Sequence, residues 1–447
     1  MPGSPKIGKE YCAPKNPRDP RKFDGRPPRR SRLRRGWHAG CFLRAVASNE
    51  SLRAGYLSGL EDAAQSLGTL APSITIGIGI PIILALSGHA TWLLMLLVLV
   101  IYLGVATAIQ VFAARWASAG SLGAFTAIGL GRRAGTLASW FYLFAMALVA
   151  ISAAICGEFC FDLLLDKLVG PSTGLMRKSL LTTGIIAAAW CFAHRDVRLS
   201  TKVMLVAELT SLALLTGITV TAMAAGKWWD VRQFRLAGTS WEGIRLAFVM
   251  AATTLAGFES MTTLGEEASN AKKTIPRTML LCLVPTGILY LLATYSISVL
   301  EDRYHIRLDD STMPYDVIAR AVGIPVLGIF AVVGIGISSF SAALAGINAG
   351  SRVLFDLARQ NHLPAALARV HPRHATPGRA IAALSLASVV SPVVLFGAGV
   401  TVTDSINYTV QAASYGYLGS YRGINAIYGT SEAENRSRSP AFANGGA

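Results

Sequence analysis

The chain has 447 residues, of which 52% are hydrophobic and 15% are charged, whereas soluble domains usually carry about 25% charged residues. Five long stretches contain no Asp, Glu, Lys or Arg, namely 63–114, 134–157, 278–300, 321–351 and 380–403. About 20 apolar residues are enough to cross the hydrocarbon core of a bilayer. The composition therefore excludes a soluble globular fold and predicts an all-α integral membrane protein.

The net charge of +16 is concentrated near the N-terminus, where residues 1–60 hold 14 Lys and Arg against 4 Asp and Glu. A run such as PPRRSRLRR at 27–35 is typical of a disordered, polybasic cytoplasmic tail that touches anionic lipid. A nucleic-acid-binding arm is the alternative, and we predict no nucleic-acid partner. No apolar segment follows the basic stretch near Met1, so no signal peptide is predicted.

Ten membrane spans are predicted in chain order, the fourth of them short and the tenth polar. They are residues 65–87, 91–113, 137–163, 179–195, 203–225, 244–264, 279–300, 322–348, 380–398 and 405–421. The spans define a transmembrane domain at 61–421, which is followed by a disordered tail at 422–447. Two loop segments, 115–135 and 350–364, have the pattern of short helices that lie along the inner membrane surface.

The distribution of Lys and Arg between the loops predicts the orientation of the chain. If the basic tail is cytoplasmic, the inner loops hold 14 of these residues and the outer loops hold 8. Basic residues favour the cytoplasmic side of a membrane protein. We therefore expect a multi-pass protein of the plasma membrane with its N-terminus in the cytoplasm.

Two of the predicted spans contain residues that favour a break in the helix. The first reads SLGTLAPSITIGIGIPIIL at 66–84, and the sixth reads LAFVMAATTLAGFES, with Gly257 near its middle or inner half. Proline removes a helical hydrogen bond, and glycine makes unwinding easy. The first span begins one half of five spans, and the sixth span begins a second half of five. Because five is an odd number, the second half must insert upside down relative to the first, as in five-plus-five inverted-repeat transporters. The alternative is that glycine and proline are merely frequent in membrane helices.

The stretch GFESMTTLGEEASNAKKTIPR at 257–277 resembles the sixth-span signature of the amino acid–polyamine–organocation (APC) superfamily. The resemblance extends over about residues 58–416, and it implies a permease with discontinuous first and sixth helices. Two departures are visible. Asn270 is followed by Ala271 where the family has proline, and spans eleven and twelve of the family have no counterpart. We therefore expect the chain as written to be poorly stable or inactive.

The resemblance places substrate between the two breaks, where freed backbone groups face a cavity. The predicted substrate-binding residues are Ala71, Pro72, Ser73, Ile74, Thr75, Ala256, Gly257, Phe258 and Glu259. Phe258 is expected to cap the substrate. A buried acid such as Glu259 is costly at membrane depth unless it is paired or hydrated, so it orients the broken helix, pairs with an ammonium group or carries a proton. The alternative is a carboxylate that only holds the local backbone.

Further acids and serines are candidates for coupling or gating. Glu208 lies within the fifth span and can carry a proton or face a polar seam between helices. Ser338 and Ser339 in the eighth span can serve a cation site or simply allow close helix packing. Glu266 and Glu267 are expected to form a gate at the inner boundary, with Lys272, Lys273 and Arg277 as their partners.

These features predict a secondary active transporter that moves amino acids or related amines, coupled to protons or by exchange. The partners would be a small-molecule substrate, the lipid bilayer and protons. The alternatives are a non-functional truncated permease remnant, or a membrane sensor or enzyme. No catalytic residues, cofactor, metal or structural disulfide are predicted, because the six cysteines are isolated or suited to packing.

Overall fold

The computed structural model describes residues 52–170, 174–224, 229–234, 236, 239–304 and 313–437. Within these ranges the chain is helical, and its strand pairing is limited to an isolated bridge between Leu57 and Ala268. The all-α class is therefore confirmed. Most of the predicted basic tail, up to residue 51, lies outside the described residues.

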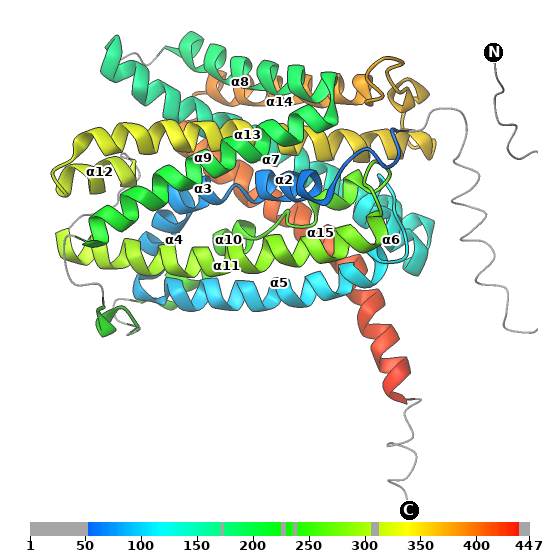
Figure 1. The fold of residues 1–447 in the computed structure, drawn as a ribbon, viewed down its shortest axis with the longest axis horizontal. Coiled ribbons are helices and arrows are strands. Elements are labelled where there is room, and N and C mark those ends of the chain that lie inside the picture. Colours follow the sequence, from blue (N-terminus) through cyan, green and yellow to red (C-terminus); the bar gives the residue numbers. More distant parts are fainter. Residues whose placement is uncertain are drawn as a thin grey trace, which may run out of the picture. The chain divides into compact units, whose positions relative to one another are not determined.

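Long helices run alongside one another in the bundle, and short helical turns connect them (Figure 1). In chain order the elements are α2 (Gly59–Leu70), α3 (Pro72–Ile74), η1 (Thr75–Gly79), α4 (Ile80–Ser87), η2 (Gly88–Ala90), α5 (Thr91–Ala113), α6 (Ser121–Leu130), α7 (Arg132–Leu168), α8 (Leu175–Arg195), α9 (Val197–Ala224), η3 (Val231–Phe234), α10 (Trp241–Thr254), η4 (Ser260–Leu264), α11 (Ala271–Tyr304), α12 (Pro314–Ala321), α13 (Pro325–Arg359), η5 (Ala365–Ala368), α14 (Gly378–Gly397) and α15 (Val402–Ser437).

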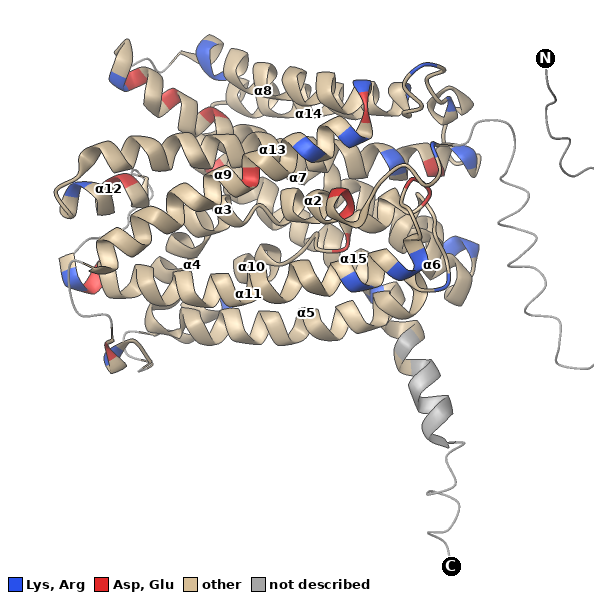
Figure 2. Cartoon of the chain, viewed as in Figure 1, with Lys and Arg blue, Asp and Glu red and all other residues tan. Residues whose placement is uncertain are grey.

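Each predicted span overlaps a helix, and six helical segments of the described chain are long and apolar enough to cross a membrane. The six are Gly59–Ala113, Arg132–Leu168, Val197–Ala224, Ala271–Tyr304, Pro325–Arg359 and Gly378–Gly397. Figure 2 shows Lys and Arg gathered mainly near the helix ends, while α5 carries no charge along its length. The chain is thus a multi-pass membrane protein.

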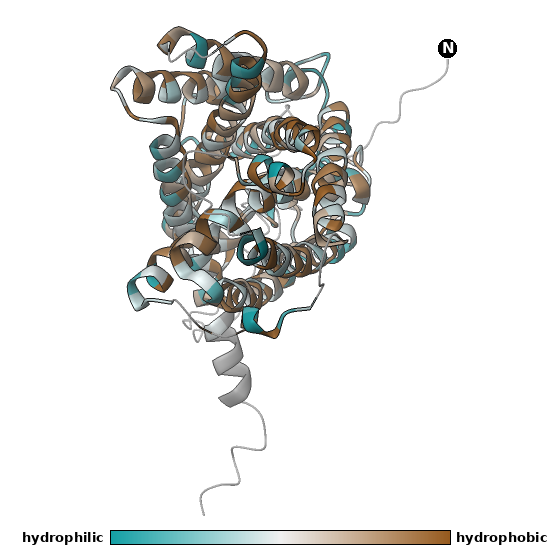
Figure 3. Cartoon of the chain, turned by 90° about the vertical axis from the view of Figure 1, so that its left-hand side faces the viewer, coloured by the Kyte–Doolittle hydropathy of each residue, from teal (hydrophilic) through white to brown (hydrophobic). Residues whose placement is uncertain are grey.

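The helix surfaces that face away from the bundle are apolar. On α11 the side chains of Leu281 and Leu292 are 71% and 61% exposed, and on α5 Val100 is 57% exposed. Figure 3 looks along the helices from the end that carries α12, and hydrophobic residues occupy many of their turns. These surfaces suit contact with lipid tails rather than with water.

Three predicted boundaries differ from the structure. The segment 350–364 is not a separate surface helix, because α13 continues through Arg359. A Cβ at Gly346 would lie 2.9 Å from the Ala150 nitrogen of α7, so this glycine lets α13 pack closely against α7. At the N-terminal side, Leu52 and Leu57 are buried rather than part of a loose tail.

The third difference concerns the C-terminal end. A disordered tail was predicted at 422–447, but α15 continues from Val402 to Ser437. The sequence between these residues contains no proline, so every residue there has the N–H that a continuous helix uses. Residues 438–447 of the predicted tail lie outside the described part of the chain.

Candidate functional site

The first break separates α2 from α3. Helix α2 ends at Leu70, and Ala71 adopts a left-handed conformation with φ 43° and ψ 60°. Pro72 follows at the first position of α3, where its missing N–H costs no helical hydrogen bond. The chain then forms a π-helical turn before α4 begins. The predicted interruption near Pro72 is therefore present.

The second break lies after α10, which ends at Thr254. Gly257 has φ 93°, and an ideal Cβ there would lie 2.4 Å from Thr69 Cγ2 and 2.9 Å from the Tyr417 hydroxyl. Only glycine combines this backbone conformation with so close an approach to α2. The chain resumes as the 3-10 turn η4, so the sixth span is interrupted at Gly257 as predicted.

Hydroxyl side chains hold the two breaks together. Ser66 Oγ donates to the Phe258 carbonyl (2.6 Å) and accepts from the Met261 N–H (3.2 Å). The hydroxyls of Thr69 and Ser260 lie 2.8 Å apart. Each of these hydrogen bonds joins α2 to the sixth span, so the two breaks are held against each other.

A cavity of about 140 Å³ lies at the breaks. Ala71, Ile74, Thr75 and Ala256 line it, as the sequence predicted for the site. The other lining residues of the cavity are Thr69, Leu70, Ile78, Gly79, Ile82, Ile83, Val149, Ser152, Ala153, Cys156, Met250, Thr253, Thr254, Ala342, Ile406, Asn407, Val410, Ala413 and Tyr417. The wall is largely apolar, and side chains from α7, α13 and α15 complete it.

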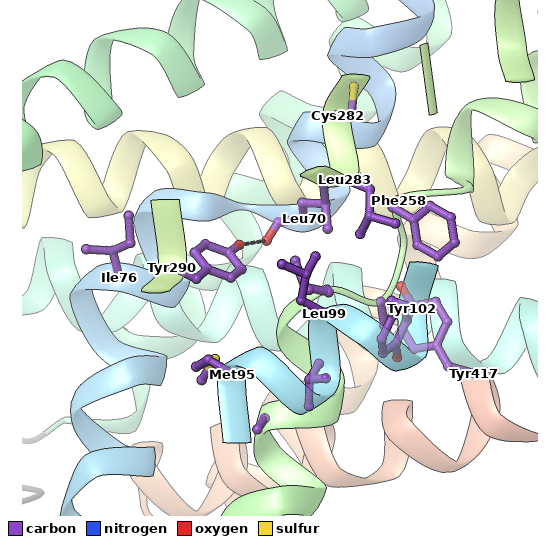
Figure 4. Packing of buried hydrophobic residues seen from close by; sticks show 14 of the residues in the cluster. Leu70, Ile76, Met95, Leu99, Tyr102, Phe258, Cys282, Leu283, Tyr290 and Tyr417 are labelled. Atoms are coloured by element: carbon purple, nitrogen blue, oxygen red, sulfur yellow. Dashed lines mark hydrogen bonds between the residues drawn. The ribbon is translucent and has the colours of Figure 1, made fainter. Parts of the chain in front are cut away.

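Five of the predicted site residues do not line this cavity. These are Pro72, Ser73, Gly257, Phe258 and Glu259, which are not among its lining residues. Phe258 is fully buried and packs edge-on against Tyr102 of α5, with ring centroids 5.8 Å apart (Figure 4). In this structure Phe258 therefore belongs to the packed core and does not cap the cavity, because its ring fills the space between α5 and the break.

Glu259 is fully buried beside a group of tyrosines. Its Oε2 accepts a hydrogen bond from the Tyr421 hydroxyl (2.7 Å), whereas its Oε1 has no hydrogen-bond partner within the described residues. Tyr102, Tyr142 and Tyr417 also lie close enough to interact with its charge. Sequence reasoning missed these rings, and the polar, tyrosine-rich tenth span was the signal that could have found two of them.

Glu208 of α9 bridges the first break to α13. Its Oε1 accepts from the Ser73 N–H (3.0 Å) and from the Ser73 hydroxyl (2.9 Å), and its Oε2 accepts from the Ser338 hydroxyl (2.6 Å). The sequence had named these residues separately, and the structure brings all three together. Ser339 does not join them, because its hydroxyl donates to the Ile335 carbonyl of its own helix.

The chain is similar to known proteins in both sequence and fold. The sequence pattern of the amino acid permease family matches residues 64–418. The chain belongs to the amino acid permease family. This membership supports a membrane transporter.

Relatives of this permease are themselves described only as transporters. Uncharacterized transporters from Mycobacterium bovis and Mycobacterium tuberculosis are 34% identical over 172 residues, which cover 38% of this chain and 36% of theirs. The match thus spans about a third of the length of these curated relatives. A solved structure of a Na⁺-coupled sialic acid symporter, substrate-bound and outward-open, is similar in fold with a TM-score of 0.51 and 13% identity. The similarity covers 84% of this chain and 86% of that one.

Ion pairs connect the permease's sixth span to α13 at the end of the bundle that carries α6. Glu267 pairs with Arg352 (2.5 Å), and both side chains are almost completely buried. Glu266 pairs with Arg359 (2.6 Å). The predicted partners Lys272, Lys273 and Arg277 are wrong for these acids in this structure. They lie on the exposed face of α11, whereas the arginines project from α13 directly opposite the loop that carries the acids.

The segment before α2 closes over the same end. The N–H groups of Tyr56 and Leu57 both donate to the Glu267 carbonyl, at 2.8 and 3.0 Å. Glu61 in the first turn of α2 pairs with Arg198 of α9 (2.8 Å). The segment before α2, the sixth span, α9 and α13 are thus tied together by polar contacts on the α6 side of the cavity.

Proposed function

We propose that the chain carries an amino acid or a related amine across the plasma membrane by alternating access, coupled to protons or by exchange. The observation that carries this proposal is the meeting of two interrupted helices at one cavity. Paired breaks of this kind mark the central site of inverted-repeat transporters. The hydrogen bonds from Ser66 to the Phe258 carbonyl and from the Met261 N–H to Ser66 keep the two breaks in register there.

Glu208 supports coupling to protons. As a carboxylate it accepts three hydrogen bonds, two of them from Ser73 at the start of α3 and one from Ser338 of α13. A proton on Glu208 would remove its charge and at least one of these acceptor positions. The contact between the first break and α13 would then weaken, and the broken helix could move relative to α13.

The ion pairs at the α6 end support a gate. Glu267 with Arg352 and Glu266 with Arg359 join the sixth span to α13, so substrate can leave past them only after these pairs separate. Such pairs bias the equilibrium between two states when they form in only one of them.

The test is uptake by the purified full-length protein in proteoliposomes. A panel of radiolabelled amino acids and amines is supplied with and without an inward-acid pH difference, and empty liposomes serve as the control. We expect saturable uptake of at least one compound, with a rate that responds to the pH difference or to unlabelled substrate inside. Uptake equal to that of empty liposomes for the whole panel, from correctly inserted protein, would refute the proposal.

A further inference from the structure

We propose that the surface where α8 ends and α14 begins binds the headgroup of an anionic phospholipid, whose acyl chain lies along α14. The inference concerns a lipid partner of the permease and does not depend on the substrate that it carries. It comes from four arginines around a well-bonded turn of the α13–α14 loop. The four are called the arginine patch and are Arg195, Arg369, Arg373 and Arg379.

Three imidazole rings pack together at this place. The ring centroids of His371 and His374 lie 4.7 Å apart, and those of His194 and His371 lie 5.2 Å apart. An ideal Cβ at Gly378 would lie 2.8 Å from His194 Cε1, so the first residue of α14 touches the last turn of α8. The end of α8, the α13–α14 loop and the start of α14 therefore meet at one surface.

Hydrogen bonds hold the loop in a defined conformation at this surface. The N–H of His371 donates to the Thr376 carbonyl (2.8 Å), and the N–H of Ala375 donates to the His371 carbonyl (2.8 Å). The Thr376 hydroxyl donates to the His194 carbonyl of α8 (2.9 Å). A surface that is already ordered loses little conformational entropy when a ligand binds to it.

The patch arginines are carried by this arrangement. Arg195, Arg373 and Arg379 are each next in the chain to a residue of the imidazole contact, and Arg369 lies two residues before it. All four side chains are exposed, and within the described residues none of them forms a salt bridge. Arginine binds phosphate oxygens through two parallel hydrogen bonds, so these free guanidinium groups suit a phosphate ester.

Acidic residues do not neutralise the patch. Residues 357–403 contain no Asp or Glu. On the α8 side the acid nearest in sequence is Asp196, which already accepts hydrogen bonds from the Tyr56 hydroxyl (3.0 Å) and the Arg198 N–H (2.7 Å). Even with Asp196 counted, four positive charges stand against one negative charge. The surface therefore favours an anionic ligand.

An aromatic residue places the patch at the level of lipid headgroups. Trp190 of α8 is 38% exposed, and its ring stacks on His194 with centroids 5.5 Å apart. Tryptophan is enriched at membrane–water interfaces. Because α14 is also apolar and long enough to cross a membrane, the patch lies where the phosphate groups of one leaflet lie.

The exposed face of α14 continues from the patch as an apolar stripe, which is why a lipid fits better than a soluble phosphate ester. Leu386 and Val390 are 65% and 50% exposed. They follow Arg379 by about two and three helical turns, so all three side chains lie on one face of the helix. The rise from Arg379 to Val390 is about 16 Å, which is close to half of a hydrocarbon core of about 30 Å. One acyl chain can therefore run along this stripe.

The first experiment measures which lipids the full-length protein retains. Purified protein is solubilised from vesicles that contain equal amounts of phosphatidylglycerol and phosphatidylcholine with identical chains, and bound lipid is counted by native mass spectrometry. We expect phosphatidylglycerol to be retained over phosphatidylcholine by roughly tenfold or more, because several basic side chains act together on one anionic headgroup. Equal retention of the two lipids overturns the inference.

A second arm separates a lipid from a soluble phosphate ester. Glycerophosphoglycerol is the same headgroup without acyl chains. At millimolar concentration it should leave the retained phosphatidylglycerol in place, because it makes no contact with the stripe on α14. Displacement of the lipid by this compound would make the patch a site for soluble phosphate esters and would overturn the lipid assignment.

Substitutions then test whether the patch is responsible. The triple variant Arg195→Gln, Arg373→Gln and Arg379→Gln should bring the retention ratio close to one. Its matched control removes three positive charges from the exposed face of α11 at the same end of the bundle (Figure 2), and should keep the wild-type ratio. The control substitutions are Lys272→Gln, Lys273→Gln and Arg277→Gln.

A wild-type ratio in the patch variant, or an equal loss in both triple variants, would attribute the preference to the general basic charge of the chain and overturn the inference. The single variant Arg379→Gln keeps the test decisive if the triple variant does not fold. It should lower the ratio by about fivefold, as expected for one basic side chain near anionic lipid. An unchanged ratio in folded Arg379→Gln would remove the start of α14 from the site.

Discussion

Gly257 shows how a single residue fixes the geometry of the second break. Its φ of 93° belongs to the left-handed side of the backbone map, and its missing side chain lets Thr69 and Tyr417 approach. The left-handed backbone conformation alone costs a non-glycine residue about 1–2 kcal/mol. The contact at 2.4 Å to Thr69 Cγ2 adds steric strain to that cost.

We therefore expect Gly257→Ala to reduce uptake by about tenfold or more, because 1.4 kcal/mol already corresponds to tenfold and the break must shift to admit the methyl group. The measurement is initial uptake rate per inserted molecule. Gly217→Ala in α9 is the matched control, since nothing lies within 4 Å of a Cβ at Gly217. An alanine there should be tolerated and should stabilise the helix by about 0.5–1 kcal/mol. Wild-type uptake by Gly257→Ala would contradict the role given to this glycine.

At the scale of elements, the joint between the sixth span and α13 depends on a buried ion pair. Arg352 is 1% exposed and Glu267 is fully buried, so neither charge can turn to water if its partner is lost. Breaking such a pair from one side costs about 3–5 kcal/mol, whereas removing both charges costs much less.

Arg352→Met should consequently lower the melting temperature of the detergent-solubilised protein strongly, and adding Glu267→Gln should recover most of the loss. Melting is followed by the amount of monodisperse protein that remains after heating. Arg320→Met provides the control, because the Arg320–Asp316 pair is at the surface and Arg320 is 60% exposed; surface pairs contribute about 0–1 kcal/mol. If the double variant is no more stable than Arg352→Met alone, the pair does not act as a unit.

The elements also show what the sequence could and could not predict. The apolar stretches and the positions of Pro72 and Gly257 were enough to place the spans and both breaks, since these depend on local composition and backbone chemistry. The ion-pair partners were not predictable, because Arg352 lies 85 residues from Glu267 and meets it only through packing. Tyr417 and Tyr421 were missed for the same reason. The tenth span looks like a poor crossing because of Asn407, Tyr408, Gln411, Ser414 and Tyr415. In the structure Tyr421 donates a hydrogen bond to Glu259, and Tyr417 lines the cavity.

At the scale of the whole molecule, the two ends of the bundle differ in their polar contacts. At the α6 end, buried pairs and the segment before α2 join several elements. From the breaks, the cavity follows η1 and α4 through Ile78, Ile82 and Ile83, in the direction away from those pairs. The excess of Lys and Arg in the loops of the α6 end predicts that this end is cytoplasmic, so the cavity would extend toward the outside.

Cysteine labelling in cells tests this orientation with one substitution at each end. Arg373→Cys lies in the exposed loop between α13 and α14, and Arg320→Cys lies on α12 at the opposite end. Both are made in a background in which the six native cysteines are serine. A membrane-impermeant maleimide should label Arg320→Cys in intact cells and Arg373→Cys only after permeabilisation, because a charged reagent cannot cross the hydrocarbon core.

The background protein without either cysteine should stay unlabelled in both conditions. The reverse pattern would place the α6 end outside, and it would require the N-terminus and the ion pairs of Glu266 and Glu267 to face the exterior.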